Sequence, residues 1–290
     1  MDRDIWTIVF NDNDELFLLK NQIISLIKFK NTLSYNVIIN ETRSRETRLK
    51  MENIGIYDLL DEAPFNTCVY DAGDFLNKNE MHKSQGYINQ QILKLQVYKK
   101  SPHIQHIILD AKDIACKKKP LEKFHPKRHL RRPNNFFGAY EHFMKKWYPD
   151  AKCIPVRPPS TPYLFKKQIL KDLEESFGSR EEYIEELKRY YVPQTKFFKK
   201  LDNRINPDLQ VQCISEFFIY NLYEQKVDHF YKEFTGSPVM HMQWLTCDED
   251  DEKEIGDASF ISLHRKRVKV IGQEQAQKLI NSKIGVDDRT

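Results

Sequence analysis

Short apolar segments alternate with helical patterns through the first 115 residues of this chain, and this alternation constrains the fold more than any other feature. The apolar segments are rich in β-branched residues and cover 5–10, 35–40, 67–71 and 106–109. A helical pattern with one apolar face follows the first segment, and another over 86–99 precedes the last. Strands that alternate with helices predict an α/β fold, with a mostly parallel sheet and crossover helices on its faces.

Each expected strand ends in polar, hydrogen-bonding or charged residues. The residues at or just beyond these ends include Asn11, Asp12, Arg43, Asp71, Asp110 and Asp113. Ligands of open α/β sheets bind at the carboxyl ends of the strands, so we expect these side chains to converge on one edge. The chain has only 9 Gly and contains neither a dinucleotide fingerprint nor a Walker-type loop. A phosphate group at this edge would therefore be bound by strand-end side chains.

The second half of the chain is dominated by aromatic-rich helical patterns. Helices are expected over 136–147, 163–177, 179–190, 215–226 and 273–283, with a late strand over 260–263. No internal repeat or low-complexity linker separates the two halves. We expect residues 1–115 to form an α/β half and residues 116–290 a helical half whose late strand returns to the first, packed as one compact unit.

The small net charge of +4 conceals an uneven distribution. The stretch 117–132 contains eight Lys and Arg residues against one acid, Glu122, and so carries +7. The rest of the chain is therefore slightly acidic. A basic patch of this density predicts contact with an anionic polymer or a membrane surface, although a solvated loop is the alternative.

Cysteine usage and hydropathy bear on the compartment. The five cysteines stand singly, which favours a reducing compartment over a disulfide framework or a zinc site. No stretch approaches 18 consecutive apolar residues, and the N-terminus enters the first strand pattern without a signal peptide. These features predict a cytoplasmic protein, with peripheral contact to the inner face of the membrane as a further option.

The motif Asp110-Ala-Lys-Asp113 directly follows the apolar segment 106–109. Carboxylates in this position can hold a divalent cation, because Mg²⁺ and Mn²⁺ sites use one or two carboxylates together with substrate phosphates. The alternative is that Asp110 only caps the following turn. The motif alone does not decide between them.

Six short segments carry a family resemblance through their order and spacing. They are Ile8–Asp12, Gly86–Leu95, Asp110–Asp113, Thr161–Lys166, Ser215–Tyr220 and Ser262–Arg265. Together they resemble nucleotide-sugar-dependent glycosyltransferases of the GT-A type, and more narrowly a small bacterial and viral group found with capsule and surface-polysaccharide genes. The resemblance implies a GT-A-like (Rossmann-like) fold. It also implies transfer of a sugar from a nucleotide-sugar donor to a hydroxyl of a saccharide, a lipid-linked saccharide or a surface-polysaccharide precursor.

The resemblance gives Asp110 and Asp113 the role of ligands to Mn²⁺ or Mg²⁺, with His264 as a third ligand. Such a metal neutralises the charge that builds on the leaving diphosphate. The chain departs from the family's Asp-x-Asp motif, because two residues separate the acids and Lys112 is one of them. A lysine can bind a phosphate directly, so the metal dependence stays open. The alternative for His264 is a partly exposed histidine in a basic tail.

Donor binding is expected from residues in several segments. They are Phe10, Asn11, Asp12, Arg43, Asp71, Gln91, Lys94 and Lys112. By the resemblance, the first three contact the base and ribose of the nucleotide. Gln91 and Lys94 share a helix face that can reach the sugar or the diphosphate, and a solvated helix face is the alternative for this pair.

The acceptor half supplies the remaining expected site residues. The resemblance implies acceptor binding by Thr161, Tyr163 and Tyr220. Glu216 is the expected general base, because an inverting transfer needs a carboxylate to take the proton of the acceptor hydroxyl. The alternative for Glu216 is a first-turn glutamate favoured by the helix dipole, and the stereochemistry of transfer stays open.

Two other functions fit parts of the sequence. A metal-dependent nuclease would use Asp71, Asp110 and Lys112, with the basic stretch 117–132 along the phosphates of a nucleic acid. This alternative leaves the aromatic second half unexplained. A binding module without catalytic activity would use the same basic stretch on an anionic polymer or membrane surface. In a transferase, the stretch would hold an anionic acceptor or a membrane-linked carrier.

Overall fold

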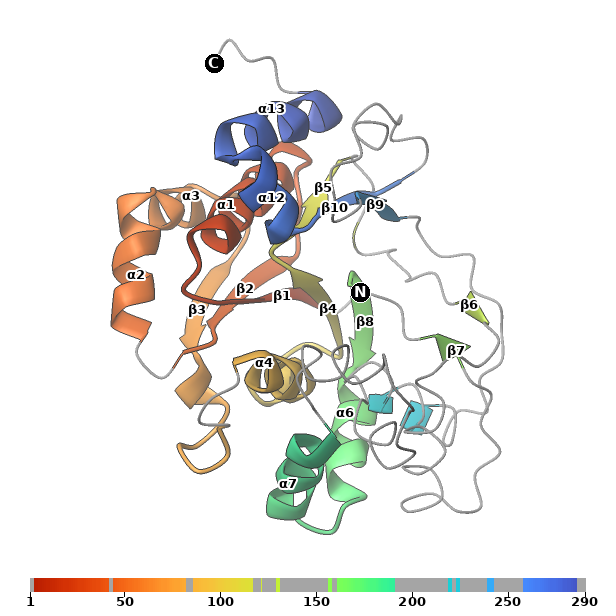
Figure 1. The fold of residues 1–290 in the computed structure, drawn as a ribbon. Coiled ribbons are helices and arrows are strands. Elements are labelled where there is room, and N and C mark those ends of the chain that lie inside the picture. The colour runs from red at the N-terminus through yellow and green to blue at the C-terminus, as the bar shows by residue number, and fades with distance from the viewer. Residues whose placement is uncertain are drawn as a thin grey trace, which may run out of the picture.

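A computed structural model describes residues 3–41, 44–81, 86–116, 121, 129–130, 156–157, 161–190, 219–220, 223–224, 239–242 and 258–285. Its centre is a five-stranded sheet with the strand order β3-β2-β1-β4-β8 (Figure 1). The strands are β1 (Arg3–Val9), β2 (Ser34–Ile39), β3 (Thr67–Asp71), β4 (Gln105–Asp110) and β8 (Tyr163–Lys166). The first four are parallel, whereas β8 pairs with β4 in antiparallel orientation. The predicted α/β fold with a mostly parallel sheet is confirmed.

The strands bury both of their faces, and alternate residues serve different cores. In β1, Trp6 and Ile8 belong to one hydrophobic cluster, and Ile5 and Val9 belong to the other. A strand that is buried on both faces needs apolar side chains at odd and even positions alike. This explains why the segment is a continuous apolar run in the sequence.

Helices cover both faces of the sheet (Figure 1). One face carries α1 (Asn13–Lys28), α2 (Ser44–Asn53), α3 (Ile56–Asp61), α12 (Arg265–Ile271) and α13 (Gln273–Ile284). The other carries α4 (Gly86–Gln96), α6 (Lys167–Glu175) and α7 (Arg180–Tyr190). The late helices α12 and α13 pack against α1, so the end of the described chain lies beside its first helix.

A second sheet begins directly after β4. It has the order β5-β10-β9, with β5 (Asp113–Ala115), β10 (Phe260–Leu263) and β9 (Val239–Met242). The predicted late strand over 260–263 is therefore confirmed as β10, which is antiparallel to β5. This pairing brings the segment that follows β10 back to the turn at the end of β4. A separate two-stranded pair consists of β6 (His129–Leu130) and β7 (Val156–Arg157).

Some sequence predictions differ from the structure. The predicted helix over 163–177 is wrong at its start, because Tyr163–Lys166 forms β8 and only Lys167–Glu175 is helical. The first four residues become a strand because β4 offers an edge for them to pair with. Helices α2, α3 and α12 were not predicted. The expected helix 136–147 lies outside the described residues, as does most of 215–226.

Within the described part of the chain, none of the helices combines the length and the apolar character that crossing a bilayer requires.

Candidate functional site

Asp110, the last residue of β4, lies at the centre of a charged cluster at the carboxyl edge of the sheet. One carboxylate oxygen, Oδ1, lies 2.9 Å from the ammonium of Lys94. The other, Oδ2, lies 2.8 Å from the ammonium of Lys112 and accepts a 3.0 Å hydrogen bond from Thr161 Oγ1. The structure thus brings together four residues that the sequence predicted for the site, with two cations on one carboxylate.

These partners come from separate parts of the fold. Lys94 projects from the last turn of α4, Lys112 lies in the turn between β4 and β5, and Thr161 precedes β8. Lys94 has 3% of its side chain exposed, against 23% for Lys112 and 21% for Asp110. The cluster therefore has a buried side at Lys94 and a side open to solvent at Lys112.

The turn that carries Lys112 is held by buried hydrogen bonds. Asp113 Oδ2 accepts a 2.9 Å hydrogen bond from the amide of Asp110. Gln22 Nε2, from α1, donates to the carbonyl oxygens of Asp110 and Asp113 at 2.8 and 2.7 Å. The amide of Leu263 in β10 donates to the carbonyl of Lys112 at 2.9 Å. Sequence analysis missed Gln22, since a polar residue between apolar helix positions carries no local sign that it is buried.

Burial and charge act in opposite directions on the acids of this turn. Burial by itself would raise the pKa of Asp110, but the ammonium groups of Lys112 and Lys94 hold that pKa well below its usual range. Burial also raises the pKa of Asp113, to about 6, although Lys112 opposes this effect. Asp110 is therefore the ionised centre of the cluster, and its charge is matched by both lysines.

A second charged group lies at the end of β1. Asp12 caps α1 by accepting hydrogen bonds from the amides of Asp14 and Glu15. Arg265, the first residue of α12, approaches Glu15 to 3.1 Å and Asp12 to 3.7 Å. Its guanidinium carbon lies 5.9 Å from the centre of the Phe10 ring. Arg265 and Glu15 are thus site residues that sequence analysis missed, and only the return of the late strand places Arg265 here.

Glu15 sits in an environment that disfavours its charge. Burial raises the pKa of Glu15 to about 7, although the guanidinium of Arg265 opposes this rise. The negative charge of Asp110 adds to the upward shift. The pKa of Glu15 therefore depends on charges from both Arg265 and Asp110.

Phe10 is packed against the start of α4. A Cβ on Gly86 would lie only 2.7 Å from Cε1 of the Phe10 ring, so a residue with a side chain would have to displace that ring. Asn40, at the end of β2, donates a 2.7 Å hydrogen bond to the carbonyl of Gly86 and fixes the helix start. The half-buried Phe10 ring is therefore held between α4 and Arg265.

His264 lies between β10 and α12, close to the charges of the cluster. Its Nδ1 accepts a 3.1 Å hydrogen bond from the amide of Lys266 and so caps α12. Burial lowers the pKa of His264 to about 4, and the nearby positive charges of Lys112 and Lys266 act in the same direction. The imidazole is neutral at pH 7.

The expected metal site does not fit the residues found here. Within the described ranges, no three His, Cys, Asp or Glu side chains gather as a group that could hold a metal ion. Both oxygens of Asp110 face ammonium groups at 2.8–2.9 Å, where a divalent cation would be repelled by two like charges. Asp113 is fully buried, and one of its oxygens accepts the amide of Asp110. The arrangement of Asp110, Asp113 and His264 therefore does not fit a divalent cation.

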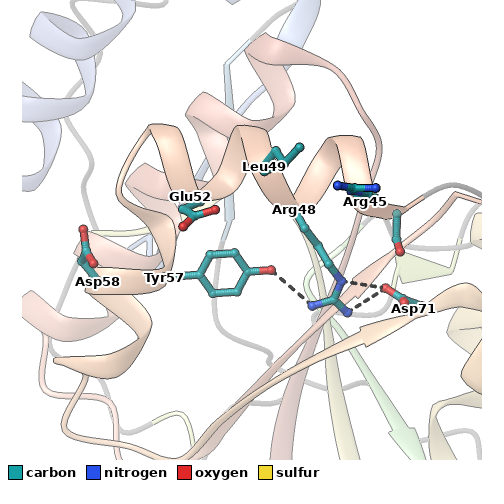
Figure 2. A pocket seen from close by; sticks show the side chains of 8 residues that line it. Arg45, Arg48, Leu49, Glu52, Tyr57, Asp58 and Asp71 are labelled. Atoms are coloured by element: carbon teal, nitrogen blue, oxygen red, sulfur yellow. Dashed lines mark hydrogen bonds and ion pairs between the residues drawn. The ribbon is translucent and has the colours of Figure 1, made fainter.

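Asp71 belongs to a different location. Figure 2 shows its carboxylate paired with the Arg48 guanidinium, at 2.7 Å to Nη2, with Tyr57 on the other side of that arginine. These residues line an open pocket of about 610 Å³ between α2 and the edge strand β3. Strands β2 and β1 separate β3 from β4, which places Asp71 roughly 14 Å from Asp110 at about 4.8 Å per strand. The nuclease alternative is not supported, because its two acids do not meet.

The remaining predicted residues divide into three groups. Asn11 lies in the loop after β1, where its backbone N–H donates to Glu41 Oε1. Gln91 is buried within α4. Tyr163 and Tyr220 are fully buried and pack edge to face in the core, so the structure does not bring them to the open side of the cluster. Arg43, Glu216 and most of the basic stretch 117–132 lie outside the described residues.

No family model matches the chain, and no curated protein matches it either. Among solved structures, the chain is similar to the galactosyltransferase LgtC in complex with donor and acceptor sugar analogues. That pair has 10% identity and a TM-score of 0.46, over 96% of this chain and 95% of the other. The bifunctional glycosyltransferase WbbM shows 10% identity and a TM-score of 0.37, over 97% of this chain and 51% of the other. TarS of S. aureus shows 11% identity and a TM-score of 0.29, over 60% and 30%.

Proposed function

We propose that this protein is a glycosyltransferase that moves a sugar from a nucleotide-sugar donor to a hydroxyl of a saccharide acceptor. The observation that carries the proposal is the cluster of Lys94, Lys112 and Asp110 at the carboxyl edge of a mostly parallel sheet. That edge is where open α/β sheets bind ligands, and a cationic group there suits a diphosphate. The six sequence segments that resemble GT-A glycosyltransferases support the same function.

The group at the end of β1 suits the nucleotide part of the donor. Phe10 offers an aromatic ring that packs against Gly86, where the missing side chain leaves room for it. Arg265 adds a positive charge beside the ring. Asp12 and the loop after β1 add hydrogen-bonding groups for the base and ribose. In this arrangement the nucleotide lies along the end of β1 and its diphosphate extends towards Lys112.

The acceptor is expected to meet residues of the second half of the chain. Of the three acceptor residues predicted from the sequence, Thr161 reaches the Asp110 cluster, where its buried hydroxyl donates to Asp110 and so helps to position that carboxylate. Glu216 remains our proposed base, which would take the proton of the acceptor hydroxyl in an inverting transfer. A surface-polysaccharide precursor or a lipid-linked saccharide is the proposed acceptor, and the stretch 117–132 would meet its anionic part or the membrane surface.

Nucleotide binding is the first test. A ligand that binds only the folded state raises the melting temperature, and a ligand at about 100 times its Kd adds about 2.7 kcal/mol. We expect UDP or GDP to raise the melting temperature by several degrees, and CMP to serve as a third nucleotide in the same assay. No response to any of the three, together with tight and salt-sensitive DNA binding, would reject the transferase in favour of a nucleic-acid enzyme.

Arg265→Ala refines the test within the site. Removal of one charged hydrogen-bonding partner should weaken binding of the responding nucleotide about 10-fold. Lys269→Ala is the matched control, because Lys269 is an exposed cation on the same helix α12. Equal affinity of both variants and the unchanged protein would remove Arg265 from the proposed donor site.

A further inference from the structure

The charge balance around Asp110 differs from that of a metal-binding carboxylate. A carboxylate that binds a divalent cation needs at least one oxygen without a cation beside it. Each oxygen of Asp110 already faces a lysine ammonium group within 2.9 Å. Lys112 also lies close to the carboxyl group of Asp113, so two lysines face two acids and the cluster carries no excess charge. What the cluster can offer a diphosphate is a lysine ammonium group on its open side.

The two lysines differ in their access to a ligand. Lys94 lies beneath Asp110 with 3% of its side chain exposed, and Lys112 lies on the open side with 23% exposed. Hydrogen bonds from Gln22 and Leu263 to the backbone of residues 110–113 fix the turn from which Lys112 projects. An ammonium group has three N–H donors, so the bond from Lys112 to Asp110 leaves capacity for phosphate oxygens.

We infer that Lys112 binds the diphosphate of the donor in the place of a divalent cation, while Lys94 neutralises Asp110 and holds it beneath. This inference rests on the proposed function and specifies how its leaving group is stabilised. Lys112 is the group in contact with the donor. Lys94 is a positioning residue, because it acts on the ligand through Asp110.

The bonds, electrons and protons of the transfer step can be accounted for without a metal. The bond between the anomeric carbon and the diphosphate oxygen breaks, and its electron pair remains on that oxygen beside the Lys112 ammonium. The acceptor oxygen forms the new bond to the anomeric carbon, and its proton goes to the general base of the acceptor side. A fixed cation aimed at the developing charge lowers the barrier without any reorganisation at the moment of reaction.

The test measures binding of UDP and GDP by titration calorimetry, in buffer with EDTA and in buffer with MnCl₂. We expect the same affinity in both buffers within about twofold. Lys112→Gln should weaken binding about 10- to 100-fold in both, as expected for loss of a hydrogen bond between charged groups. Lys171→Gln is the matched control, since Lys171 is an exposed lysine of α6 that also pairs with a carboxylate.

Three other outcomes would reject the inference, the role of Lys112 or the proposed function. Binding that EDTA abolishes and MnCl₂ restores overturns the inference and leaves the glycosyltransferase proposal standing. Binding in EDTA with equal affinities for Lys112→Gln and Lys171→Gln removes Lys112 as the ligand. No binding of UDP or GDP in either buffer overturns the inference, and the absence of any response to CMP as well overturns the proposed function.

Lys112→Asp gives an independent test, because it places two carboxylates in an Asp-x-Asp arrangement. We expect this variant to lose nucleotide binding in EDTA and to regain it in MnCl₂. Titration with MnCl₂ alone should show a site in the variant that the unchanged protein lacks. A Mn²⁺ site already present in the unchanged protein would overturn the inference.

Discussion

An acidic side chain lies at each end of the neighbouring strands β1 and β4, Asp4 at the amino ends and Asp110 at the carboxyl ends. The two acids differ in what surrounds them. At the amino ends, Asp4 pairs with His106 Nδ1 at 2.8 Å and accepts a 2.6 Å hydrogen bond from Ser101 Oγ. All three side chains are at most 3% exposed. At the carboxyl ends, Asp110 meets two lysines on a surface that is open at Lys112.

The difference shows which acid marks a ligand site. Hydrogen bonding and position on the central strands are common to Asp4 and Asp110. The group at Asp110 differs because it is partly exposed and pairs one carboxylate with two lysine ammonium groups. The group at Asp4 is closed and holds the N-terminal part of β1 against β4 and the loop before it. An ionisable cluster therefore indicates function only together with an open side at which a ligand can reach its charges.

Asp4→Ala should give the largest loss of stability. The change leaves His106 and Ser101 buried without their shared acceptor, which costs about 1–3 kcal/mol for each of the two groups. Urea unfolding of this variant and of Asp61→Ala, an exposed aspartate, measures the difference. A loss below about 1 kcal/mol would mean that the closed cluster does not hold the sheet together.

Asp110→Asn should affect sugar transfer more strongly than stability. We expect a loss of stability of about 1–3 kcal/mol, because Lys94 stays buried without the charge that faces it, whereas solvent can hydrate Lys112. Sugar transfer should fall at least about 100-fold, since the two ammonium groups lose the carboxylate that orders them. The measurements are urea unfolding and turnover with the nucleotide sugar whose nucleotide binds. Full turnover in this variant would show that sugar transfer does not require the Asp110 carboxylate.

Glu15→Gln should change the stability in the direction opposite to Asp4→Ala and Asp110→Asn, and the size of the change should depend on pH. Because the pKa of Glu15 is raised from 4.5 to about 7, the folded state binds more protons than the unfolded state between these values. The stability of the unchanged protein therefore falls as pH rises from about 4.5 to about 7. The variant lacks this loss and should be more stable at pH 8 by on the order of 1–3 kcal/mol.

Melting temperatures between pH 4 and pH 8 test this expectation. The advantage of Glu15→Gln should vanish near pH 4, where the carboxyl is protonated in both states. Glu62→Gln, at an exposed position, is the control variant in the same measurements. A constant difference between the variant and the unchanged protein at every pH would exclude titration of Glu15 as the cause.

Part of the fold follows from the sequence because it depends on local patterns. The apolar runs 5–10, 35–40, 67–71 and 106–109 lie on the four parallel strands, and their polar ends identify the edge where Asp110 lies. The pairing of β8 with β4 is not local, and so the segment 163–166 was predicted as helix. Helix α12 escaped prediction because seven residues are too few for a clear apolar period.

The strand ends, the motif Asp110 to Asp113 and Lys112 within it can be recognised in the amino-acid sequence alone. The positions of Lys94 under Asp110, of Arg265 beside Phe10 and of Asp71 beside Arg48 follow only from how the chain packs. This is because periodicity and turn chemistry act over a few residues. The charge and access of a site depend on which distant segments the packing of the sheet brings together.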